Sequence, residues 1–199
     1  MTTRDLFVTR IYEANLAEAG LGEELLEACL TLSEDDTAGQ NWCAEHAYKG
    51  YTSYASLTDL PNRFPVFSAL RKILDVHVAA FAKDLAFDLG KGRLKLDNIW
   101  VNILEKGGAH SSHIHPHSVI SGTMYISVPK GAGALRLEDP RLPMMMAAPT
   151  RTEAPEPLKP FVTLQPGVET LYLWESWLRH EVLPHGSKTP RISVSFNYA

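Results

Sequence analysis

The sequence predicts a mainly β protein, a sandwich or barrel of short strands with helices packed against one outer face. Three observations support this fold class. Apolar residues recur with a helical period only in the first part of the chain, before about residue 90. From residue 95 the chain consists of short segments rich in β-branched and aromatic residues, and turn sequences rather than helices separate them. Many short strands without intervening helices are typical of a sandwich or a barrel.

Two helices are expected in residues 1–94, the helical part of what we take to be a single domain of 199 residues. The first covers residues 22–36, and its apolar face is formed by Leu25, Leu26, Cys29 and Leu32. The second covers residues 64–88, and Gly90 is expected to stop it. Its shared face consists of Val66, Leu70, Ile73, Leu74, His77, Phe81 and Leu85. Residues 37–62 show no clear period and are interpreted as a loop.

The β core is expected in residues 95–199. Its strand candidates are LKLDNIWVNIL, VISGTMYISV, GALRLED, FVTL, ETLYLW and RISVSFNY, and turn signals such as KGG, PKGAG and QPG separate them. The segment 140–160 contains six prolines. It cannot be a central strand, because proline lacks the N–H that a ladder requires. We expect a long loop there that covers the mouth of the barrel.

The composition argues against several classes of function. A formal net charge of −4 gives no reason to expect attraction to nucleic acid or membranes. No apolar stretch is long enough to span a bilayer, and the N-terminus lacks the features of a signal peptide. The only two cysteines, Cys29 and Cys43, form no disulfide framework, so a reducing cytoplasm is the simplest location. A homodimer is compatible with these totals, which do not determine the oligomeric state.

Six of the eight histidines lie in two short clusters, which packing alone explains poorly. These are His110, His113, His115 and His117, followed by His180 and His185. Imidazole is the commonest side-chain ligand for iron, zinc and copper. His113 and His115 are two residues apart, so on an extended strand both would point to one side. His180 follows a hydrophobic strand and is the natural third ligand of one ion, although a zinc or nickel site without redox chemistry fits the cluster equally.

An arginine lies in a predicted strand soon after the second cluster. Arg191, Ser193 and Ser195 alternate in RISVSF, so their side chains should point to the same side. A buried arginine is costly unless an anion meets it, and a guanidinium with a neighbouring hydroxyl suits a carboxylate. The alternative is an internal salt bridge to Glu169 or Glu175.

In this combination of motifs the sequence resembles the Fe(II)/2-oxoglutarate oxygenase superfamily and, more narrowly, a bacterial and phage family of 2OG-Fe(II) oxygenases. The likeness covers most of the chain and is most specific in NIWVNILEKGG, HIHPHSVISGTMYI, LEDPR, WESWLRHEV and PRISVSFN. It implies a double-stranded β-helix, a cupin-like jelly roll, with the N-terminal helices on its outer face. It also implies Fe(II), the cosubstrate 2-oxoglutarate, O₂, and hydroxylation of a small molecule or a peptide side chain.

The resemblance assigns the metal ligands residue by residue. His113 matches the first ligand and His180 the distal one. The second position, which is Asp or Glu in most of the superfamily, is occupied here by His115. We therefore expect three imidazole ligands. The alternatives for the second position are Asp139, His110 and His117.

The resemblance likewise assigns the cosubstrate contacts. Arg191 matches the residue that pairs with the C5 carboxylate of 2-oxoglutarate, and Ser193 is its hydroxyl partner. Asn102 and Tyr125 lie on strands that often supply further polar contacts. Two rival functions remain from the residues alone: a cupin-like three-histidine metalloenzyme that does not use 2-oxoglutarate, and a ligand-binding β-sandwich without catalysis. The substrate itself is not encoded in any recognisable motif.

Overall fold

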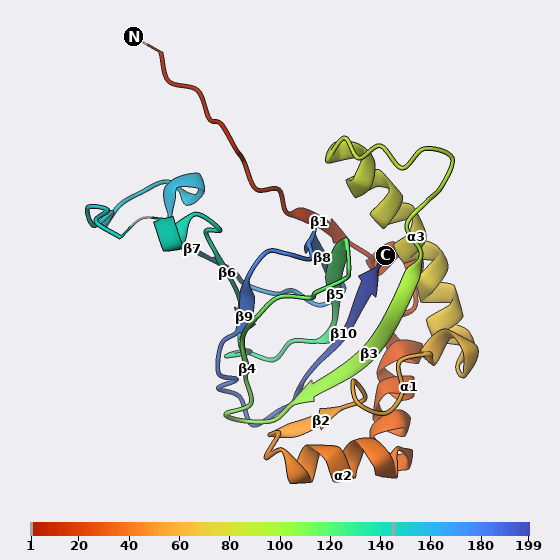
Figure 1. The fold of residues 1–199 in the computed structure, drawn as a ribbon. Coiled ribbons are helices and arrows are strands. Elements are labelled where there is room, and N and C mark those ends of the chain that lie inside the picture. The colour runs from red at the N-terminus through yellow and green to blue at the C-terminus, as the bar shows by residue number, and fades with distance from the viewer. Residues whose placement is uncertain (1, 145) are drawn as a thin grey trace.

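The fold is a jelly roll made of two antiparallel sheets with helices on one outer face (Figure 1). The computed structural model describes residues 2–144 and 146–199. The larger sheet has the order β1-β8-β5-β10-β3-β2, and the smaller has the order β4-β9-β6-β7. This arrangement confirms the double-stranded β-helix that the resemblance implies.

The strands of the larger sheet are β1 (Tyr12–Asn15), β2 (Gly50–Thr52), β3 (Leu96–Leu104), β5 (Ile120–Ser127), β8 (Thr170–Glu175) and β10 (Arg191–Tyr198). Those of the smaller sheet are β4 (His110–His113), β6 (Leu135–Glu138), β7 (Phe161–Leu164) and β9 (His180–Val182). The first third of the chain, expected to be helical, thus also supplies β1 and β2 to the larger sheet.

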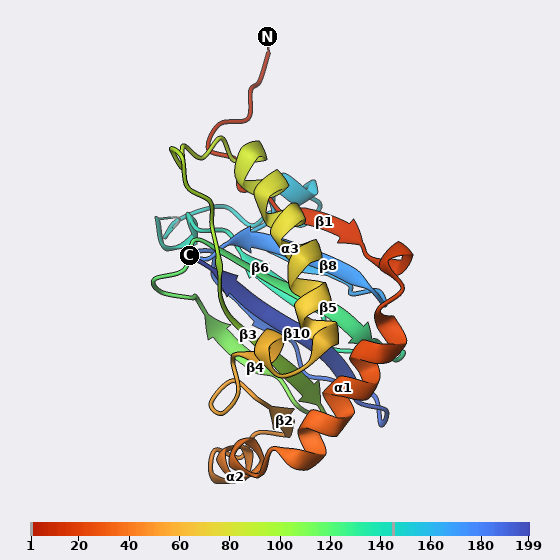
Figure 2. The same ribbon diagram turned by 90° about the vertical axis from the view of Figure 1, so that its right-hand side faces the viewer.

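The helices α1 (Gly22–Asp35) and α3 (Pro65–Asp84) lie across the outer face of the larger sheet (Figure 2). The main apolar core is formed between them and the sheet, and it contains both α3 residues such as Leu70 and Leu74 and sheet residues such as Leu171 and Val194. Burial of this helix face is the expected consequence of its apolar period. The side chains on the other face of the same strands are therefore left to line the interior of the jelly roll.

The end of α3 differs from its prediction. The helix stops at Asp84, before Gly90, because Ala86 takes a left-handed conformation with φ of 56°. The N–H of Ala86 donates to the carbonyl of Lys83, and the N–H of Phe87 donates to the carbonyl of Ala82. These two bonds form a helix-ending motif that usually employs glycine, which is why the sequence pattern misplaced the stop.

The interpretation of residues 37–62 as a loop was wrong in part. This segment contains α2 (Thr37–Glu45) and β2, followed by a 3₁₀ turn at Leu60–Asn62. The Asp36 side chain caps α2 by accepting a hydrogen bond from the N–H of Gly39 at 3.0 Å. Only Gly39 and Cys43 of α2 are buried, so the helix has no apolar period for the sequence to reveal.

The proline-rich segment 140–160 joins β6 to β7 and contains two 3₁₀ turns, Leu142–Met144 and Glu156–Leu158. In Figure 1 it projects away from the sheets beyond β6 and β7. Among its described residues, none lines the interior cavity of the jelly roll, in contrast to the expected cover over the barrel mouth. No helix in the described part of the chain is long and apolar enough to cross a membrane.

Candidate metal centre

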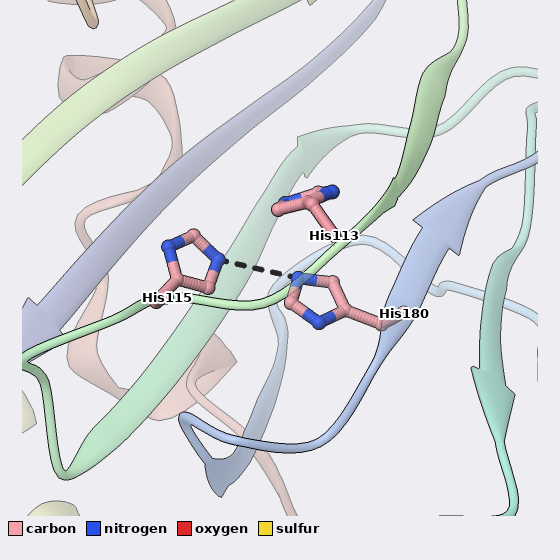
Figure 3. Close-up of side chains that lie close together, drawn as sticks. All are labelled: His113, His115 and His180. Carbon is pink, nitrogen blue, oxygen red and sulfur yellow. Dashed lines mark hydrogen bonds between the residues drawn. The ribbon is translucent and has the colours of Figure 1, made fainter. Parts of the chain in front are cut away.

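Three histidine side chains converge inside the jelly roll: His113, His115 and His180 (Figure 3). His113 ends β4, and His180 opens β9 as its direct partner in the ladder. One ligand nitrogen from each of the three rings lies within 4.8 Å of the others. The Nε2 atoms of His115 and His180 are 3.2 Å apart. The geometry therefore brings together the three rings that the sequence analysis selected.

His115 reaches this point by a route that the sequence did not predict. It was expected on the same strand as His113, but β4 ends at His113 and His115 lies in the following turn. The N–H of His115 donates to the carbonyl of Ser176 at 3.0 Å, which holds the turn against the segment before β9. Its position thus depends on a contact between distant parts of the chain rather than on strand alternation.

The remaining ring nitrogens orient two of the three imidazoles. Nδ1 of His113 lies 2.7 Å from the Ser111 carbonyl, and Nδ1 of His180 lies 2.9 Å from the Leu178 carbonyl. A carbonyl accepts a proton from Nδ1, so Nε2 of each ring keeps its lone pair for a ligand. Nδ1 of His115 instead lies 3.4 Å from Nδ2 of Asn197.

The environment keeps two of these rings, His115 and His180, neutral at pH 7. Burial, aided by the neighbouring His113, lowers the pKa of His180 to about 3 and that of His115 to about 4. A neutral imidazole is the form that binds a metal ion. Aromatic rings enclose the group, since Trp174 packs against His180 at 4.7 Å and Trp100 against His115 at 5.9 Å between ring centroids.

The donor set fits one transition-metal ion. Ligand nitrogens that share an ion at about 2.1 Å lie roughly 3 Å apart, close to the spacing of His115 and His180. A set of three neutral imidazoles suits iron, zinc, copper or nickel, whereas calcium and magnesium prefer oxygen ligands. Three ligands on one side of an ion leave the other positions open for small molecules.

The alternative second ligands do not belong to the convergent group of three histidines. The carboxylate of Asp139 accepts two hydrogen bonds from the Arg141 side chain, at 3.0 and 2.9 Å. His110 is hydrogen-bonded to the Tyr48 hydroxyl at 2.7 Å. His117 is exposed, with a left-handed φ of 71°. His185, from the second cluster, is buried and its Nε2 lies 2.9 Å from the Thr189 carbonyl.

Arg191 lies deep inside the same cavity as the three histidines. Only 1% of its surface is exposed, and no described carboxylate lies within ion-pair distance of it. The internal salt bridge to Glu169 or Glu175 is therefore absent among the described residues. Its Nε has no hydrogen-bond partner, and its guanidinium stacks on the Tyr125 ring at 4.7 Å. An unpaired buried cation is costly, so this end of the cavity is suited to an anion.

The other predicted contacts lie around Arg191. Ser193 Oγ is 3.4 Å from Nη1 of Arg191, and the Tyr125 hydroxyl is buried without a partner. Asn102 lines the cavity, but its amide accepts from Thr52 at 2.9 Å and donates to Ser195 at 3.1 Å. Of these, Tyr125 is free for a ligand whereas Asn102 is already engaged.

The cavity that contains both groups has a volume of about 450 Å³. Its lining also includes Trp174 and two residues that sequence reasoning did not single out, Tyr48 and Thr52. The indole Nε1 of Trp174 is another buried donor without a partner. No pattern in the sequence marks Tyr48 and Thr52, because both lie outside the β core that was expected to form the site.

A jelly roll that holds three convergent imidazoles and an unpaired guanidinium in one cavity defines a metal-binding protein with an adjoining anion site. Residues 98–197, half of the chain, match the protein family described as "Putative 2OG-Fe(II) oxygenase". The chain belongs to this family of Fe(II)- and 2-oxoglutarate-dependent oxygenases. No curated protein matches it.

Solved structures with the same fold are distant in sequence. A prolyl-4-hydroxylase from Pseudomonas putida has a TM-score of 0.61 at 15% identity, over 96% of this chain and 92% of that one. The epimerase SnoN, in complex with Fe³⁺, α-ketoglutarate and nogalamycin RO, has a TM-score of 0.66 at 15% identity. The match covers 96% of this chain and 78% of that chain. A 2OG-Fe(II) oxygenase family oxidoreductase from Burkholderia pseudomallei gives 0.50 at 14%, and the match covers 67% of this chain and 57% of that chain.

Proposed function

We propose that this protein oxidises an organic substrate with Fe(II), 2-oxoglutarate and O₂, with hydroxylation as the default outcome. His113, His115 and His180 would hold the iron, and Arg191 would pair with the C5 carboxylate of 2-oxoglutarate. When bound, the iron and the cosubstrate supply the oxidising chemistry, and the protein supplies position and a shielded cavity. The observation that carries the proposal is the unpaired, buried Arg191 in the cavity of the three imidazoles.

The chain's own residues perform three tasks in this proposal. The Ser111 and Leu178 carbonyls fix the orientation of two ligand rings. Arg191 and Ser193 orient the cosubstrate by its far end, because a guanidinium fork and a hydroxyl together bind a carboxylate directionally. Trp100 and Trp174 exclude water beside the ligand rings, which strengthens the electrostatic interactions inside the cavity.

Three neutral ligands change the charge of the centre. A carboxylate in the second position would neutralise one of the two positive charges of Fe(II). The neutral imidazole of His115 neutralises neither charge. The dianion 2-oxoglutarate meets a more positive centre as a result, which favours its binding.

The substrate class stays broad, a small molecule or a peptide side chain. The structural neighbours include a prolyl-4-hydroxylase and an epimerase in complex with nogalamycin RO, which supports either class. Tyr54 lines the cavity, is 53% exposed and packs edge-on against Trp100 at 5.1 Å between ring centroids. We propose that the substrate enters along these two rings.

A titration of the anaerobic Fe(II) protein with 2-oxoglutarate tests the function. A visible charge-transfer band is expected to appear with a stoichiometry of one. A cupin-like three-histidine enzyme that ignores 2-oxoglutarate would bind iron and give no band. A non-catalytic ligand-binding β-sandwich would retain no transition metal even after reconstitution with Fe(II). The position of Arg191 favours the oxygenase over the cupin-like alternative, which does not require it.

We also propose a cellular compartment and partners for this enzyme. Cys29 and Cys43 are both buried free thiols, which supports a reducing compartment such as the cytoplasm. We expect no nucleic-acid or membrane partner on the grounds of charge, and a homodimer is testable by sedimentation.

A further inference from the structure

Tyr48 brings a phenol from outside the predicted β core into the cavity of Arg191. It lies between α2 and β2, and its ring lines the same cavity as Arg191, Ser193 and Tyr125. Among the described residues, the hydroxyl has one hydrogen-bond partner, Nε2 of His110 at 2.7 Å. Burial raises the pKa of this phenol, so the hydroxyl keeps its proton at pH 7.

His110 is the first residue of β4, and its pairing with Val182 of β9 fixes its place in the sheet. It lines the cavity but does not belong to the group of three convergent imidazoles. The ring centroids of His110 and Tyr48 are 5.7 Å apart, and both residues line the cavity that also contains Arg191. Neither residue of this pair is one of the three candidate metal ligands.

Donor and acceptor counting shows what the pair can do. A hydroxyl has one proton to donate and two lone pairs to accept with. With its proton on Nε2, His110 donates to the phenol oxygen, and the hydroxyl hydrogen of Tyr48 remains available for a third group. A carboxylate offers about four acceptor positions, and a guanidinium fork uses two of them. A carboxylate on Arg191 therefore retains acceptor positions for a hydroxyl.

We propose that Tyr48, oriented by His110, is a further positioning residue for the C5 carboxylate of 2-oxoglutarate. The carboxylate is then held from two sides, by Arg191 on β10 and by a phenol from the connection between α2 and β2. This inference rests on the proposed function, because it needs a dicarboxylate at Arg191. It assigns a binding role to a residue in the N-terminal part of the chain, outside the stretch that matches the family.

The chain contains a matched control. Tyr12 and His77 form a second tyrosine–histidine pair, with 2.8 Å between the hydroxyl and Nδ1. This pair joins β1 to α3, and neither residue lines the cavity. Removing the Tyr12 hydroxyl therefore reproduces the loss of a tyrosine–histidine hydrogen bond without affecting the cavity.

The experiment compares Tyr48→Phe with Tyr12→Phe by calorimetric titration of the anaerobic Fe(II) proteins with 2-oxoglutarate. Loss of one hydrogen bond to a charged group predicts a Kd about 10-fold higher for Tyr48→Phe, whereas Tyr12→Phe binds as the wild type does. Iron content stays at the wild-type level in both variants. In turnover, the KM for 2-oxoglutarate rises while kcat at saturating cosubstrate changes little.

A double-mutant cycle tests the part played by His110. His110→Ala is expected to weaken 2-oxoglutarate binding in the wild-type background and to add nothing in the Tyr48→Phe background. Wild-type affinity in Tyr48→Phe, or fully additive effects of the two substitutions, overturns the inference while the proposed function stands. Failure of the wild-type protein to bind 2-oxoglutarate at all overturns both.

Discussion

His113 and His180 face each other as direct partners in the β4–β9 ladder, and their ring centroids lie 4.3 Å apart. Two ligands on adjacent strands are held by backbone hydrogen bonds rather than by a flexible loop. This rigidity favours a preformed metal site, so changes of single ligands should affect the metal more than the fold.

Replacing His180 by alanine should abolish metal retention while leaving the fold largely intact. Each ligand contributes one of three bonds, and the core that stabilises the fold lies mainly between the helices and the outer face of the larger sheet. Metal content after gel filtration and the far-ultraviolet circular dichroism spectrum measure the two effects. His117→Ala, in an exposed residue near the site, is the control and should keep its metal; a metal-replete His180→Ala protein would exclude His180 as a ligand.

His115 is the ligand in which this chain departs from most of its superfamily, and two substitutions test it. His115→Ala should lower iron affinity by at least about 10-fold, since the site loses a direct ligand. His115→Asp should retain iron, because a carboxylate in this position gives the two-histidine, one-carboxylate set. Equal iron affinity for His115→Ala and the wild type would show that another group supplies the third ligand.

Arg191→Ala should spare the metal and weaken 2-oxoglutarate binding by about 1.5–3 kcal/mol, the value of a hydrogen bond to a charged group. Anaerobic titration of the Fe(II) protein measures this loss. Arg136→Ala serves as a control, because Arg136 pairs with Glu181 and does not line the cavity. Normal cosubstrate binding by Arg191→Ala would end the assignment of Arg191 as the anion-binding residue.

Arg191 should also lower the free energy of unfolding of the protein when no anion is bound. Its guanidinium is buried without a carboxylate partner among the described residues, so Arg191→Met should stabilise the metal-free and cosubstrate-free protein by about 1–3 kcal/mol. Urea unfolding of the two proteins measures the difference. A less stable Arg191→Met protein would indicate that the guanidinium already has a partner in the ligand-free state.

The metal-free protein should lose stability as the pH falls from about 6.5 to about 4. The ordinary pKa of histidine is 6.5, whereas burial lowers the folded-state values to about 3 for His110 and His180 and about 4 for His115. In this window the unfolded chain binds protons that the folded chain does not, so each group costs up to about 1.4 kcal/mol per pH unit.

Urea unfolding at several pH values between 7 and 4 tests this dependence. The His180→Ala protein should show a shallower slope, because one of the three groups is gone. A stability that is constant or rises toward pH 4 would contradict the assigned protonation states.

Local sequence patterns were sufficient to predict several elements of the fold. The predicted strands FVTL and RISVSFNY coincide with β7 and β10, and the helix at residues 22–36 coincides with α1 to within one residue. The helix was recognised from its apolar period, and the two strands from their β-branched and aromatic residues. The strands β4 (HSSH) and β9 (HEV) are short and lack such a run of residues, so no local pattern marks them.

By itself, the sequence determined a mainly β sandwich or barrel, the two histidine clusters, and a strand on which Arg191, Ser193 and Ser195 share one side; the resemblance narrowed this class to a jelly roll. Only the tertiary structure decided that His115 joins the site from a turn, that His110 pairs with Tyr48 instead of a metal, and that Arg191 lacks a carboxylate partner. The physical reason is that ladder register and loop docking join residues far apart in the chain. A local pattern records which side of a strand is buried, and it carries no information about which distant side chain lies opposite.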